Sequence, residues 1–112
     1  MRQLFLSTVA DEEALDADYT SASVNLYLVE LFSAQLIWTD AGSLAGTVYL
    51  QGSNDGVNWV DLDDIALSGE GTDSFVQSDV FYKYARFFYD RSAGDGTLSI
   101  LLNAKGGSAV QA

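Results

Sequence analysis

The sequence predicts an all-β protein, an antiparallel β-sandwich with a jelly-roll topology of about eight strands. Apolar and polar residues alternate with a period of two along several short segments, and clusters of Gly, Asp, Asn and Ser separate these segments. No segment has convincing helical periodicity. An immunoglobulin-like sandwich is the alternative, which the absence of a Cys pair around a core Trp disfavours.

The composition suits one packed domain. The chain has 112 residues, of which 48% are hydrophobic and 12% aromatic. We expect a single β-sandwich over residues 1–105, with a flexible tail over residues 106–112. No apolar run approaches the roughly 18 residues of a membrane span, and no targeting segment is expected.

The first half of the chain is expected to contain several strands. Residues 3–9 form a first strand, at a sheet edge or as an arm, and residues 10–22 form an acidic loop with a short helical turn. Residues 24–38 fit a period of two better than 3.6, and the small residues near Ser33 indicate two strands with a break there. The cluster at residues 40–43 predicts a turn.

A β-hairpin is predicted around residues 46–62. Asn54, Asp55 and Gly56 suit its turn, because Asn and Asp tolerate positive φ, Gly prefers it, and short polar side chains can bond the local backbone. Val48 and Leu50 point to one face. Trp59, on the return strand, is expected in the core opposite the strand that carries Arg86. The role predicted for this turn is structural.

The second half begins with a short strand at residues 74–77 and continues with the strongest strand signal, residues 80–89. Alternation places Ala85, Phe87 and Tyr89 on one face and Tyr84, Arg86 and Phe88 on the other. Residues 90–96 are expected to form a second hairpin turn. The last strand, residues 97–104, directs Leu98, Ile100 and Leu102 inward.

The residue types argue against catalysis. The chain has no His and no Cys, so the commonest general base, thiolate metal ligands and the usual triads are missing. We therefore predict a protein that is not an enzyme and carries no cofactor or metal. Asp61, Asp63 and Asp64, or Asp90 with Ser92 and Asp95, have spacings that suggest calcium, but solvated turn carboxylates are the favoured interpretation. Asp61 and Asp63 as a glycosidase pair is a further, disfavoured alternative.

The formal net charge is −11, from five basic and sixteen acidic residues. This charge repels phosphate backbones and anionic lipid, so neither nucleic acid nor a membrane is an expected partner. Tyr84, Phe88 and Leu101 are predicted to share the outward face with Arg86, whose charge needs a partner: an internal carboxylate, solvent or another subunit. These four residues form the predicted subunit contact of a homo-oligomer, with a trimer favoured.

Two resemblances follow from the hairpins. Residues 51–59, Gln-Gly-Ser-Asn-Asp-Gly-Val-Asn-Trp, followed by Lys-Tyr-Ala-Arg at 83–86, are similar to elements of discoidin-type, galactose-binding-like jelly rolls. That family binds glycans or lipid head groups through loops. Lys83 replaces the first Arg of its Arg-Tyr-x-Arg element, and the flanking Cys pair is missing.

The closer resemblance covers roughly residues 24–106. The Ser53–Trp59 hairpin, the Tyr82–Arg86 strand and the Gly94–Leu98 segment resemble small structural proteins of tailed bacteriophages. This resemblance implies a virion location, other virion proteins as partners, and a role in head decoration or cementing, or in a fibre or the tail. The alternative is a carbohydrate-binding module, with a glycan as partner.

Overall fold

Seven β-strands form one antiparallel hydrogen-bonded sheet in the computed structural model, which describes residues 2–78 and 80–106. The strands are β1 (Arg2–Ala14), β2 (Tyr19–Thr20), β3 (Val24–Asn25), β4 (Val29–Ser53), β5 (Val60–Ser68), β6 (Gly71–Ser78) and β7 (Tyr84–Gly106). The all-β antiparallel fold class is thereby confirmed. No helix in this part of the chain has the length and apolarity needed to cross a membrane.

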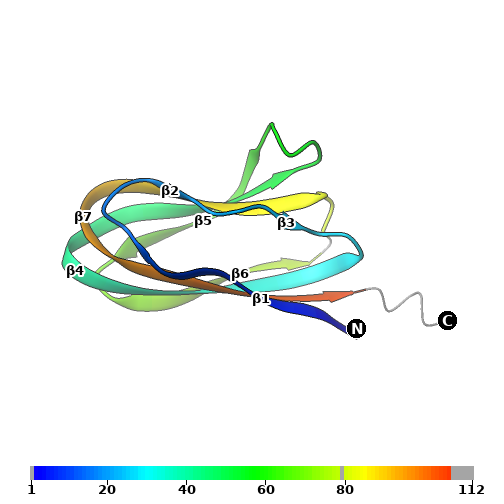
Figure 1. The fold of residues 1–112 in the computed structure, drawn as a ribbon, viewed down its shortest axis with the longest axis horizontal. Coiled ribbons are helices and arrows are strands. Elements are labelled where there is room, and N and C mark those ends of the chain that lie inside the picture. The colour runs from blue at the N-terminus through cyan, green and yellow to red at the C-terminus, as the bar shows by residue number, and fades with distance from the viewer. Residues whose placement is uncertain (1, 79, 107–112) are drawn as a thin grey trace.

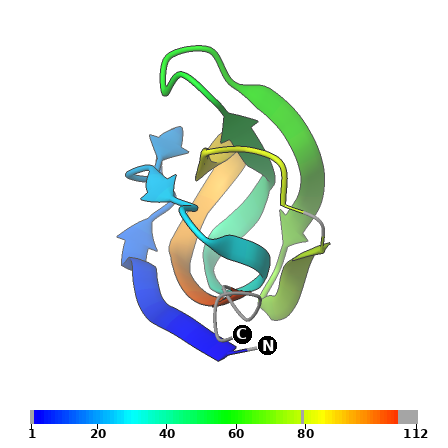
Figure 2. The same ribbon diagram turned by 90° about the vertical axis from the view of Figure 1, so that its right-hand side faces the viewer.

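The sheet folds over on itself because β4 and β7 run through both of its layers (Figure 1). The first half of β4 pairs with β6 and with the second half of β7, next to β1; we call this the β1 layer. The second half of β4 pairs with β5 and with the first half of β7, next to β2 and β3; this is the β5 layer. Seen end-on, the strands surround a shared interior (Figure 2).

The two predicted turns at residues 40–43 and 90–96 are instead bends within continuous strands, so both turn predictions are wrong. The two segments pair with each other, as Asp40 with Gly96 and Gly42 with Asp95, and the register shifts at several points between them. Such bulges kink a strand without reversing it. Turn-forming residues thus carry β4 and β7 from one layer to the other.

The core lies between the layers and follows the predicted alternation. Ala85, Phe87 and Tyr89 are buried from one layer and Leu98, Ile100 and Leu102 from the other. The ring of Phe87 in the β5 layer lies 5.9 Å from the ring of Phe75 on β6 in the β1 layer. Val48 and Leu50 point to the same face, as predicted, and both are fully buried.

Several predicted boundaries differ from the structure. The first strand extends to Ala14, and residues 15–18 cross between the layers without a helical turn, so the acidic segment 10–22 is only partly a loop. No break occurs at Ser33: residues 31–38 pair without interruption with both β6 and β7, and Ala34 is fully buried opposite Phe75 and Leu102. The break falls between β3 and β4 instead.

The part of the chain that the structure describes contains seven strands, whereas about eight separate strands were predicted, because β4 and β7 each serve both layers and the edge beside β7 is divided into β1, β2 and β3. The predicted edge position of β1 is confirmed. The jelly-roll topology stays a prediction. The flexible tail predicted over 106–112 lies, beyond Gly106, outside the described residues.

Candidate functional site

The loop between β4 and β5 projects from the body of the protein (Figure 1) and is held by its own side chains. The Asp55 carboxylate accepts hydrogen bonds from the backbone N–H groups of Asn58, 2.8 Å, and Val57, 2.9 Å, and from the Ser53 hydroxyl, 2.9 Å. These bonds lower the pKa of Asp55 well below its ordinary value. Gly56 has a φ of 75°, as the turn prediction requires.

Asn54 connects this loop to the start of β7. Its side-chain carbonyl accepts a hydrogen bond from the Lys83 backbone N–H at 3.1 Å. The loop is thereby fixed against the strand that carries Tyr84 and Arg86. The architectural role of Asn54, Asp55 and Gly56 stays a prediction, and these hydrogen bonds are the contacts through which they would exert it.

Trp59 is half-buried and outside the core, so its predicted core position is wrong. It lies opposite the strand that carries Arg86, as predicted, with the guanidinium 4.3 Å from its ring centroid. The Arg86 Nε donates to Gln51 at 2.7 Å, and the Gln51 amide donates to Asp61 at 2.9 Å. A cation–π contact and a neutral amide therefore surround the Arg86 charge, and Asp61 is reached through Gln51.

The outer face of the β5 layer carries aromatic side chains beside this network. Tyr49 and Phe88 stack on adjacent strands with ring centroids 6.4 Å apart, and Tyr84 lies two positions along from Arg86. Asp61, Asp64 and Asp90 are at outward positions of the same layer. We call this surface the aromatic face: Tyr49, Gln51, Trp59, Asp61, Asp64, Tyr84, Arg86, Phe88 and Asp90.

The four residues predicted as one subunit contact are divided between two surfaces. Tyr84, Arg86 and Phe88 belong to the aromatic face, whereas Leu101 is on the outside of the β1 layer, paired with Thr8 and Gln35. The bend in β7 separates them. The register shifts at this bend also change which residues point inward, from the odd-numbered positions up to Tyr89 to the even-numbered positions from Leu98. The prediction that Leu101 points outward is confirmed, but the single shared surface is wrong.

Outward residues of four strands form a surface without a carboxylate on the β1 layer, in a chain with a net charge of −11; the exposed Asp11 and Glu12 of β1 border it, where the Glu12 N–H donates to the Ser99 hydroxyl at 3.0 Å. Its residues are assigned by burial and by pairing, since opposite residues on antiparallel strands share a face. We call it the uncharged face: Leu6, Thr8, Leu31, Ser33, Gln35, Ile37, Thr72, Ser74, Val76, Ser99, Leu101 and Asn103. Lys105 adds one cation at its end.

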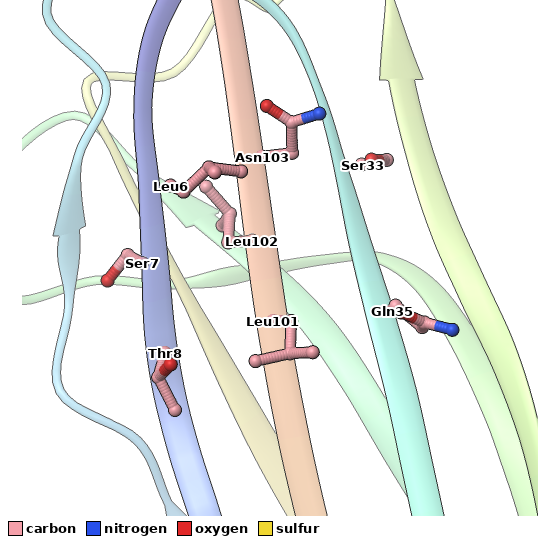
Figure 3. Close-up of a pocket in the computed structure, with 8 residues that line it drawn as sticks. All are labelled: Leu6, Ser7, Thr8, Ser33, Gln35, Leu101, Leu102 and Asn103. Carbon is pink, nitrogen blue, oxygen red and sulfur yellow. The ribbon is translucent and has the colours of Figure 1, made fainter.

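A hollow of about 430 Å³ lies on the uncharged face, between β1, β7 and β4 (Figure 3). Ser33 and Asn103 lie side by side at one level of it, and Gln35 and Leu101 at the next. A second hollow of about 200 Å³ adjoins it through the same Ser33 and Asn103. The Asn103 side-chain carbonyl is buried without a hydrogen-bond partner among the described residues.

Protruding apolar side chains border these hollows. Leu6 is 73% exposed, Val76 67% and Leu101 41%. Sequence reasoning missed this face as a unit, because its four strands are far apart along the chain. One signal was present: the outward positions of residues 31–37, 72–78 and 99–103 all lack Asp and Glu, although Glu30 immediately precedes the first segment and Asp73 lies within the second.

The free edges of the sheet carry side chains that occupy their backbone groups. On β5 the Asp63 carboxylate accepts from the Asp64 N–H at 2.8 Å, and on β6 the Asp73 carboxylate accepts from the Ser74 N–H at 2.7 Å. Both strands pair on one side with β4. On the opposite edge β1 has three register shifts. Acidic groups and bulges are common protections against edge-to-edge pairing.

Within residues 2–78 and 80–106, no three or more His, Cys, Asp or Glu side chains are placed to hold a metal ion. In the acidic segment of β5, the Asp61 carboxylate bonds Gln51 and that of Asp63 bonds the adjacent backbone.

No protein-family model and no curated protein matches the sequence. Solved structures share the fold. The exported protein XepA of PBSX has a TM-score of 0.71 at 13% identity; the match covers 93% of this chain and 38% of XepA, so the chain spans well under half of that protein. The SPBc2 prophage-derived protein YomS has a TM-score of 0.60 at 6% identity, with 88% of this chain and 93% of YomS covered.

A structure of infectious bursal disease virus contains a similar chain. Its TM-score is 0.51 at 14% identity, and the match covers 93% of this chain and 32% of the viral chain. At these identities the likeness concerns the fold alone. The fold is therefore one that occurs in a prophage-derived protein and in a virus.

Proposed function

We propose that the chain is a non-enzymatic structural component of a phage virion that acts through protein–protein contacts. The observation that carries this proposal is the YomS match, which extends over 88% of this chain and 93% of a prophage-derived protein. The likeness to XepA and to a viral chain supports it. The role we propose is head decoration or cementing, or a position in a fibre or the tail.

The strand order supports the jelly-roll topology that we propose for this fold. The β1 layer contains β1, the second half of β7, the first half of β4, and β6 in that order. The β5 layer contains β2 with β3, the first half of β7, the second half of β4, and β5. Each layer thus has four strand positions, as in a double-sheet jelly roll.

The test is the protein content of purified particles. Mass spectrometry of gradient-purified virions from the encoding phage should find this chain at a fixed ratio to the major capsid protein. A phage-encoded protein that is absent from virions serves as the control for carry-over from the lysate. Recovery of the chain only in the particle-free fraction would contradict the proposal.

Sugar binding is the second candidate function, and the aromatic face favours it. Tyr49 and Phe88 present nearly parallel rings, with an interplanar angle of 22°, next to the amide and guanidinium of Gln51 and Arg86. Flat apolar rings beside hydrogen-bonding groups suit a pyranose ring, which has an apolar face and polar edges.

A glycan array with the purified chain tests this second candidate. Sugar binding predicts a defined set of positive glycans whose signal is lost in Phe88→Ala. The matched control is Val76→Ala, which removes an exposed apolar side chain from the opposite layer. An array without signal for the unmodified chain would leave the purely structural role.

A further inference from the structure

We infer that the uncharged face binds a second copy of this chain, in a two-fold symmetric dimer of β1 layers packed face to face. The inference goes beyond the proposed function, because it names a partner and a surface for the isolated chain. It starts from the distribution of charge. Two copies that each carry a net charge of −11 repel one another, and a contact that opposes two acidic surfaces adds to that repulsion.

The uncharged face is the sheet surface that best avoids the repulsion between the carboxylates of two copies. Two copies placed with this face together oppose no carboxylate within the face, since Asp11 and Glu12 lie at its border beside Ser99. The aromatic face would oppose Asp61, Asp64 and Asp90 with their own copies. The described edges are also disfavoured, since Asp63 and Asp73 occupy outward backbone N–H groups and β1 is bulged.

The shape of the face is self-complementary. Leu101, which is 41% exposed, lines one level of the hollow together with Gln35, and Asn103 with Ser33 lines it two residues further along, about 6.6 Å away along the strand. The two-fold axis lies in the plane between the two faces, perpendicular to the strands and midway between these two levels. It places Leu101 of each copy over the Ser33 and Asn103 level of the other (Figure 3). One apolar side chain then enters each hollow.

The same arrangement accounts for the unpartnered acceptor on Asn103. That oxygen is already buried in the single chain without a donor, which is costly, so rotation of the Asn103 side chain toward an incoming donor would be favourable. Gln35 is exposed at the level of Leu101, so Gln35 of the second copy arrives beside Ser33 and Asn103 and can donate its amide N–H. The dimer thus satisfies a group that the monomer leaves unsatisfied.

Sedimentation velocity over a concentration series tests the association. We expect a monomer–dimer equilibrium whose dissociation constant falls roughly tenfold when the salt concentration rises from about 0.1 M to about 0.5 M, because salt screens the repulsion between the two copies. Leu101→Asp should leave a monomer. The matched control Val60→Asp adds the same charge at a strand position of similar exposure, 47% against 41%, and should leave the dimer intact.

Cysteine cross-linking tests the geometry even if Leu101→Asp fails to fold. The chain has no Cys, so a mixture of the variants Leu101→Cys and Asn103→Cys forms covalent dimers only through introduced thiols. We expect cross-linking in the mixture and little in either variant alone. A chain that stays monomeric at both salt concentrations, an oligomer that Leu101→Asp leaves unchanged, or equal cross-linking in single variants and mixture would overturn the inference. Association with virions is measured separately, so the dimer can be refuted without refuting the virion location, and the virion location without refuting the dimer.

Discussion

Gly94 allows β7 to bend between the two layers, and its replacement by Ala should be far more costly than an equivalent change elsewhere. Gly94 and Gly69 both have positive φ, 72° and 60°. A Cβ at Gly69 would meet nothing within 4 Å, whereas a Cβ at Gly94 would collide with the backbone oxygens of Ser43 and Gly42. Replacing Gly69 by Ala therefore measures the conformational strain alone, and replacing Gly94 by Ala measures the same strain plus the steric conflict at the bend.

The expected magnitudes follow from these two terms. A Cβ in the left-handed region costs about 1–2 kcal/mol, offset in part by about 0.4–1 kcal/mol from the stiffer unfolded chain. Gly69→Ala should therefore lose about 1 kcal/mol of unfolding free energy. Gly94→Ala adds an overpacking cost of about 1–3 kcal/mol against backbone that cannot rotate away, for a total loss of about 2–4 kcal/mol.

Urea unfolding followed by circular dichroism measures both variants. The predicted difference corresponds to a melting temperature at least about 5 °C lower for Gly94→Ala than for Gly69→Ala in a domain of this size. The bend explanation also requires an unchanged m-value, since both variants should reach the same native fold. Equal losses in the two variants would refute the role assigned to Gly94.

Three further predictions concern individual side chains. Asp55→Asn should lower the melting temperature at neutral pH. The difference in melting temperature from the unmodified chain should shrink as the pH falls below about 4, because the lowered pKa of Asp55 contributes stability above the unfolded pKa that is lost on acidification. A difference that does not depend on pH would contradict this. Tyr89→Phe removes the 3.2 Å bond to the Ala45 carbonyl and should cost about 0.5–1.5 kcal/mol in urea unfolding. Burial raises the pKa of Tyr89, so the unmodified chain should lose stability above about pH 10 and the variant should lose less. Arg86→Lys should lower the free energy of unfolding by about 1–2 kcal/mol and change the fluorescence of Trp59, because Lys keeps the charge but loses the planar contact and the Nε donor. An unchanged emission spectrum would contradict the contact between Arg86 and Trp59.

The sequence predicts inward and outward residues well wherever a strand is regular. The alternation from Ala85 to Tyr89 and from Leu98 to Leu102 holds because successive side chains must point to opposite faces. The hairpin around Asp55 was also predictable, since its side chain bonds backbone groups within three residues. These features depend on local geometry.

The remaining features depend on contacts between distant segments. Gly, Asp and Ser suit a chain reversal and a strand bend equally well, and only the pairing of Gly42 with Asp95 decides for the bend. Leu101 lies in the other layer from Tyr84, Arg86 and Phe88, because the same bend separates the two halves of β7. Trp59 was expected in the core for its apolar area, but Arg86 covers its ring at the surface instead.

The claim that the uncharged face is the contact surface is tested most directly by amide chemical shifts as a function of concentration. Spectra of the labelled chain at about 20 µM and about 1 mM span the range in which a weak dimer forms. A dimer formed through the uncharged face should change the shifts of Leu6, Ser33, Leu101 and Asn103 and leave those of Tyr84, Arg86 and Phe88 unchanged. Changes confined to those last three residues, or none at any concentration, would contradict it.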